Sequence, residues 1–217
     1  MPVLGCGRTT TKIGSVICVL LTIFVATGET LTTEQVSAAI AYGAQYKTKD
    51  KFLEKGLHGV RVKLASAMAF DGISKYATFF NDWNYIAAES AGANQQLREV
   101  RPEDFNPQGL LHAFVEVHAR GAIPASKLNR RYLEQRAHLV IRVGDKNIQP
   151  IEKSMLKRSD QSPGSIVLGL PTGKITLEFA FEVSPAAVAE DVEVILIDGD
   201  GNQHKARANL AEAFESR

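Results

Sequence analysis

The residues best suited to chemistry lie in one stretch, 110–119, which reads LLHAFVEVHA. Apolar and polar side chains alternate along it, as they do along a β-strand with one buried face. The second face carries an aromatic ring, two imidazoles and a carboxylate, from Phe114, His112, His118 and Glu116. Imidazole and carboxylate groups are common ligands of zinc and other divalent metals, so this face is the first candidate for a chemical site.

A metal site on this face would need a further ligand from a neighbouring strand. His138 lies on the next strand that we predict, and pairing of the two strands would bring its imidazole toward Glu116 and His118. One divalent metal bound there could activate a water molecule for hydrolysis. A metal-dependent hydrolase is therefore one alternative for the function of this protein. Its candidate metal ligands are His112, Glu116, His118 and His138.

A second candidate for metal binding is an acidic turn near the C-terminus, Asp-Gly-Asp-Gly-Asn. Oxygen ligands at alternating positions begin the calcium loop of an EF-hand, and Asp198, Asp200 and Asn202 follow that spacing. However, Gln203 stands where the loop needs glycine, and Asn209 stands where it needs a glutamate. A hairpin turn explains these residues without a metal, and the alternative is a calcium-stabilised surface or adhesion domain.

A basic loop offers a different kind of site, because its arginines could grip carboxylate or phosphate groups through paired hydrogen bonds. Its members are Lys127, Arg130, Arg131, Arg136 and Arg142. We predict that this patch binds an envelope or extracellular protein or an anionic polysaccharide. The alternative is a solvated loop whose charge is offset by nearby acids.

The N-terminus indicates where the protein works. Arg8 and Lys12 precede an apolar run from Ile13 to Ala26, which is typical of a secretory signal peptide, here covering 1–28. The run is shorter than the roughly 20 residues that span a bilayer, so we expect no permanent membrane span after cleavage. The chain has no Asn-x-Ser/Thr site, which favours a bacterial secreted or periplasmic protein.

Composition excludes some classes of function. The 25 basic and 24 acidic residues leave a formal charge of +1, which argues against a nucleic-acid-binding protein. Both cysteines, Cys6 and Cys18, fall within the predicted signal peptide. The exported chain would then have no disulfide and no thiolate nucleophile or ligand, so its stability must come from its core.

Helices are predicted on the N-terminal side of the histidine-bearing strand. Thr32 with Gln35 has the spacing of a capping box, and a second short helix should follow at 49–55; we expect the pair to form a helical hairpin within 29–58. A longer helix is predicted at about 82–99. Because Phe114 shares a row with the histidines, we expect that face to be partly covered, with this helix as the candidate cover.

The remainder, 59–217, should be mainly β. Short strands separated by turn residues are predicted at 60–69, 110–119, 137–143, 147–151, 165–170, 174–183, 192–197 and 203–210, whereas 73–80 fits either a strand or a helix. This spacing is typical of an antiparallel, immunoglobulin-like β-sandwich. The predicted fold class is therefore mainly β with N-terminal helices (α+β), in which the sandwich follows the helical hairpin and contains one longer helix.

The sequence favours a non-enzymatic interaction or structural module of unknown partner. No nucleophile–base pair or metal motif of discriminating spacing is present, so we assign no catalytic residue and no cofactor, apart from the one divalent metal of the hydrolase alternative.

Overall fold

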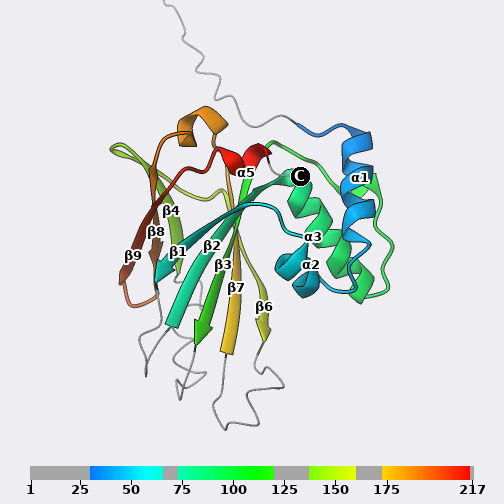
Figure 1. Cartoon of the computed structure of the whole chain (residues 1–217), viewed down its shortest axis with the longest axis horizontal. Helices are drawn as coiled ribbons and strands as arrows, with labels where there is room; N and C mark the ends of the chain where they lie inside the picture. The colour runs from blue at the N-terminus through cyan, green and yellow to red at the C-terminus, as the bar shows by residue number, and fades with distance from the viewer. Residues whose placement is uncertain (1–29, 66–72, 120–136, 160–172, 216–217) are drawn as a thin grey trace, which may run out of the picture.

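The computed structural model describes residues 30–65, 73–119, 137–159 and 173–215. The fold is mixed, with helices and two antiparallel sheets of five and four strands (Figure 1). The strand order is β1-β2-β3-β7-β6 in the first sheet and β5-β4-β8-β9 in the second. The strands are β1 (Val60–Ala65), β2 (Ile73–Asn81), β3 (Leu111–Ala119), β4 (His138–Val143), β5 (Lys146–Ile148), β6 (Glu152–Ser159), β7 (Gly173–Phe181), β8 (Val192–Ile197) and β9 (Gln203–Ala208). The helices are α1 (Thr33–Gly43), α2 (Lys49–Lys55), α3 (Asp82–Gln95) and α5 (Glu212–Glu215), with short 3-10 turns at Pro102–Asp104 and Pro185–Val188.

Strand β3 forms where its alternating sequence predicts it, and it is central in its sheet. It pairs with β2 on one edge and with β7 on the other, both antiparallel. Its apolar row lies in one buried cluster with side chains of the four-stranded sheet, so a common core joins the two sheets. The cluster includes Leu111, Ala113, Val115 and Val117 of β3 together with Leu139, Ile141, Val194 and Leu196 of β4 and β8.

The structure decides one assignment that the sequence leaves open and adds one strand that the sequence does not predict. Residues 73–80, for which strand and helix were both open, form β2, because this segment pairs with β1 and with β3 along its length. Strand β6 was not predicted at all, since its sequence EKSMLKRS lacks an apolar alternation; its pairing with β7 makes it a strand. The strand predicted at 165–170 lies outside the described residues.

Helices cover the other face of the five-stranded sheet (Figure 1). Alanines of α3 pack on Phe80 and Phe114, which are completely or almost completely buried. The small alanine side chains bring the helix close to the sheet, and α1 and α2 then pack against α3. The covered face expected from Phe114 is thus confirmed, and so is the Thr32–Gln35 capping box of α1. Within the described ranges no helix has the length and apolar character that a bilayer crossing requires.

The C-terminal end of α3 provides a test of local backbone strain. Leu97 has a φ of 55° and is 97% exposed, while the next amide, that of Arg98, donates to the carbonyl of Ala93 at 3.0 Å. Glycine adopts this left-handed conformation without the Cβ clash that leucine suffers. We expect Leu97→Gly to raise the free energy of unfolding by about 1 kcal/mol, measured by urea denaturation. A decrease in stability would show that the turn does not strain the leucine.

Candidate functional site

The four residues predicted to bind one divalent metal do not come together. His138 lies on β4, which pairs with β5 and β8 in the other sheet, so the expected pairing of its strand with β3 is wrong. The physical reason is that β2 and β7 already occupy both edges of β3. His112 is buried beneath the helices, whereas His118 near the far end of β3 has a side chain that is 39% exposed.

Glu116 and His118 belong to a group of side chains at the surface. A carboxylate oxygen of Glu116 lies 3.2 Å from a guanidinium nitrogen of Arg61 and 3.8 Å from Nε2 of His118. Arg61 also stacks over the Tyr76 ring at 4.5 Å. Across the part of the chain that the structure describes, no group of three or more His, Cys, Asp or Glu side chains is arranged to hold a metal ion.

The acidic turn predicted as a calcium site joins β8 to β9 as a hairpin. Asp198 is 3% exposed, and its Oδ1 accepts hydrogen bonds from the backbone amides of Asp200 and Asn202, both at 3.0 Å. The Asn202 side-chain amide donates to the same carboxylate, at 3.3 Å to Oδ1 and 3.2 Å to Oδ2. These contacts account for the residues as an Asp-centred turn, and calcium binding at Asp198, Asp200 and Asn202 stays a prediction.

The same carboxylate should make stability depend on pH. Burial raises the pKa of Asp198, but the hydrogen bonds from Asn202 and Asp200 and the nearby His204 imidazole outweigh burial and leave the pKa below its usual value. Because the folded pKa is the lower one, this stabilisation is complete above the unfolded-state pKa of about 3.9 and is lost as pH falls through the folded pKa.

We therefore expect Asp198→Ala to lower the free energy of unfolding by about 2 kcal/mol at pH 7. The difference from the native protein should shrink as the solution is acidified below about pH 4, because the native carboxylate then becomes protonated. Urea denaturation across this pH range measures both effects. Asp200→Ala is the matched control, since it keeps both backbone donors to Asp198; an equal loss in the control would contradict the role assigned to Asp198.

Most of the predicted basic patch, Lys127, Arg130, Arg131 and Arg136, lies outside the described residues. The remaining member, Arg142 on β4, donates to a carboxylate oxygen of Glu193 and to the side-chain oxygen of Asn147, both at 2.9 Å. Arg142 therefore serves as a link between β4, β5 and β8, which bear these partners. Anion binding by the other four residues stays a prediction.

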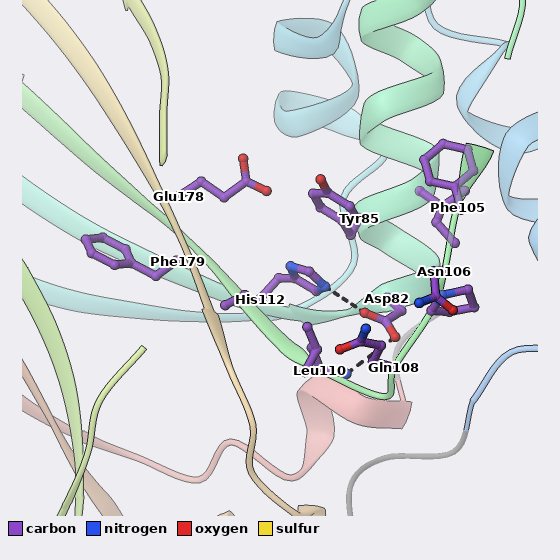
Figure 2. A pocket seen from close by; sticks show the side chains of 12 residues that line it. Asp82, Tyr85, Phe105, Asn106, Gln108, Leu110, His112, Glu178 and Phe179 are labelled. Carbon is purple, nitrogen blue, oxygen red and sulfur yellow. Dashed lines mark hydrogen bonds and ion pairs between the residues drawn. The ribbon is translucent and has the colours of Figure 1, made fainter. Parts of the chain in front are cut away.

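A pocket that no sequence pattern predicts brings Asp82, His112 and Glu178 together. A cavity of about 550 Å³ lies between the start of α3, strands β3 and β7, and the segment 105–110 (Figure 2). Asp82 is the first residue of α3 and is 5% exposed. Its Oδ2 accepts hydrogen bonds from the backbone amides of Gly109 at 2.7 Å and Leu110 at 3.3 Å, and its Oδ1 lies 2.7 Å from Nε2 of His112. The position at a helix N-terminus further favours its negative charge.

His112 is held rigidly beside this carboxylate. Its ring stacks nearly parallel to that of Tyr85, with the centroids 4.3 Å apart, and is also stacked with that of Phe80, with the centroids 5.8 Å apart. An ionised carboxylate can only accept hydrogen bonds, so Nε2 of His112 carries the proton of its hydrogen bond with Asp82. In a neutral imidazole ring the other nitrogen, Nδ1, is then a hydrogen-bond acceptor. Nδ1 is buried and has no hydrogen-bond partner among the described residues.

A second carboxylate reaches the pocket from the opposite wall. Glu178 on β7 is 8% exposed, and Figure 2 shows it on the side of the His112 ring away from Asp82. The neighbouring Phe179 points away from the pocket, into the core between the sheets. The lining that the structure describes thus contains two carboxylates and one imidazole, but neither lysine nor arginine.

The contact between Asp82 and His112 had no signal in the sequence, although both residues lie in elements that the sequence predicts. The sequence indicates His112 as a candidate metal ligand and position 82 only as the start of a helix. The two are 30 residues apart, and no local pattern relates them. The chain matches no protein-family model, and no curated protein or solved structure is significantly similar to it.

Proposed function

We propose that this chain is an extracytoplasmic binding module, with an immunoglobulin-like sandwich as its scaffold, that holds a small molecule in the pocket beside Asp82 and His112. The signal-like N-terminus supports the location, and the two antiparallel sheets with their common core support the scaffold. Small-molecule sites are typically concave, mostly apolar, and equipped with a few oriented polar groups. The pocket volume of about 550 Å³ lies within their usual range of roughly 300–1,000 Å³.

The observation that carries this proposal is the unpaired Nδ1 of His112. A buried polar atom without a partner costs about 1–3 kcal/mol, so native proteins rarely keep one. Here the atom belongs to a ring that Asp82 orients through a hydrogen bond and that stacks with the rings of Tyr85 and Phe80. A ligand that hydrogen-bonds to this nitrogen would recover that cost, and the rigid ring would lose little further entropy on binding.

The rest of the lining favours binding over covalent catalysis. The described wall contains apolar side chains, including Leu110, Phe105 and Pro107, and no serine, threonine or cysteine that His112 could activate as a nucleophile. An apolar wall with one oriented polar group can select a ligand by shape and by one hydrogen bond. This composition supports a receptor or carrier role.

The proposal is tested by closing the pocket. Gln108 is an exposed residue in the lining, so Gln108→Trp places a large ring over the cavity without disturbing the core. Fragments that bind the purified protein are detected by NMR, through shifts of the His112 and Tyr85 side-chain signals. We expect Gln108→Trp to weaken their binding by about tenfold or more.

Gln203→Trp is the matched control, because Gln203 is also exposed but lies on β9 in the other sheet. It should leave fragment affinity unchanged. Fragments that bind equally well to the native protein and to Gln108→Trp would show that they occupy another site, and the proposed function would then be wrong.

A further inference from the structure

We propose that the pocket selects a small neutral alcohol, in which one hydroxyl group is attached to an apolar body such as a single ring. The hydroxyl donates a hydrogen bond to Nδ1 of His112, and the apolar body packs on the rest of the pocket wall. This inference rests on the proposed binding function and adds to it the chemical class of the ligand.

The first observation is the direction of the hydrogen bond that His112 can make to a ligand. The Asp82 carboxylate accepts from the amides of Gly109 and Leu110, and it holds the ring proton of His112 on Nε2. The other ring nitrogen, Nδ1, faces away from Asp82 and keeps its lone pair (Figure 2). A carbonyl, ether or carboxylate oxygen beside Nδ1 would set one lone pair against another. The ligand atom that meets Nδ1 is therefore a hydrogen-bond donor.

The second observation is that both carboxylates of the pocket wall already have partners. Asp82 accepts three hydrogen bonds, and Glu178 has an interaction of its own within the protein. Neither carboxylate is left to balance a cation, and the described lining has no lysine or arginine to balance an anion. A charged ligand would lose its hydration without gaining a counter-charge, which costs far more free energy than burying a neutral hydroxyl. The pocket therefore favours a neutral donor.

The third observation is the space that the ligand can fill. Nδ1 of His112 is buried, so the donor that reaches it must be slim. A hydroxyl has a single heavy atom, whereas an amide is branched. Beyond this point, Leu110, Phe105 and Pro107 offer apolar contact, and a cavity of about 550 Å³ accommodates one ring with a short chain. A neutral alcohol that carries one ring meets all of these conditions.

The first experiment compares four probes that share a phenyl group: 2-phenylethanol, its methyl ether, 2-phenylethylamine and 3-phenylpropanoate. The ether keeps the oxygen but cannot donate, and the last two are charged. Calorimetry measures affinity at about pH 8, where an imidazole is normally neutral. We expect the alcohol to bind about fivefold to tenfold more tightly than the ether, and at least about tenfold more tightly than either ion. Equal affinity of the alcohol and the ether, or tighter binding of either ion, would overturn the proposal.

Imidazole ¹⁵N NMR tests the contact directly in the native protein. Without ligand, Nε2 of His112 should give the signal of a protonated nitrogen and Nδ1 that of an unprotonated nitrogen. Saturation with 2-phenylethanol should shift the Nδ1 signal toward lower frequency, because an unprotonated nitrogen then accepts a hydrogen bond, and the ether should cause no such shift. A protonated Nδ1 in the free protein, or an Nδ1 signal that the bound alcohol leaves in place, contradicts the proposal.

Asp82→Asn reverses the direction of the hydrogen bond in the same cavity. The asparagine oxygen can accept from Gly109 and Leu110, so its amide group donates to Nε2 of His112 and the ring proton moves to Nδ1. The ether and the alcohol can then both accept from Nδ1. We expect the preference for the alcohol to fall to about twofold or less. A variant that has the changed tautomer but keeps the native preference is a second outcome that would overturn the proposal.

Gln108→Trp separates this inference from the proposed function. Closing the pocket should weaken binding of 2-phenylethanol by about tenfold or more, as for other fragments. If none of the four probes binds but other fragments remain sensitive to Gln108→Trp, the alcohol class is wrong and the proposed binding function stands. If the alcohol binds the native protein and Gln108→Trp equally well, it occupies another site, and the inference is wrong.

Discussion

Replacing Asp82 with alanine is expected to lower the free energy of unfolding by about 3–5 kcal/mol. The carboxylate is 5% exposed and accepts hydrogen bonds from Gly109, Leu110 and His112, so its removal leaves three buried donors without partners. These donors belong to the turn before β3 and to β3 itself, whereas Asp82 begins α3. The loss is a large fraction of the roughly 5–15 kcal/mol that stabilises a typical domain.

Urea denaturation followed by the fluorescence of Trp83, the single tryptophan, measures this loss. Asp104→Ala is the control: Asp104 accepts one hydrogen bond from the Arg101 amide at 2.9 Å in an exposed turn, and its removal should cost below about 1 kcal/mol. If Asp82→Ala cost no more than this control, the Asp82 interactions would not stabilise the fold and the orientation of His112 would need another cause.

Gly43→Ala is expected to destabilise the protein by about 3 kcal/mol, although alanine is the better helix former. A Cβ atom at this position in α1 would lie 2.0 Å from the carbonyl oxygen of Ala87 and 2.8 Å from its carbonyl carbon in α3. Backbone cannot yield as a flexible side chain does, so α1 would have to move away from α3. The gain of about 1 kcal/mol in helix propensity cannot offset this separation of two packed helices.

Gly92→Ala is the matched control for this prediction. It lies in α3, where a Cβ atom would meet nothing closer than the Lys49 side chain at 3.6 Å. Here only helix propensity acts, so the free energy of unfolding should rise by up to about 1 kcal/mol. Chemical denaturation of the two variants should therefore give opposite signs. Stabilisation by both substitutions would mean that the contact of α1 with α3 tolerates a Cβ atom.

Several elements could be predicted because their signals are local. The period-2 alternation of 110–119 identifies β3, and it correctly assigns the apolar row to the core. The Thr32–Gln35 pair identifies the start of α1 because a capping box involves residues only three positions apart. Such patterns depend on geometry within one element, so no knowledge of the rest of the chain is needed.

Other elements depend on partners that are distant in the sequence. Residues 73–80 fit a strand or a helix until β1 and β3 are known to flank them. Strand β6 has no apolar alternation, and its hydrogen bonds to β7 define it. His138 was assigned to a strand correctly, but its sheet depends on which strands occupy the edges of β3.

The candidate site shows the same division most clearly. The sequence by itself determined that His112 lies on the less apolar face of a strand and that a helix begins near position 82. Only the tertiary structure decided that the two residues meet, because their contact requires α3 to lie across β3 with its first turn over that face. A hydrogen bond of 2.7 Å between side chains 30 positions apart depends on how two elements pack, and neither element encodes that packing alone.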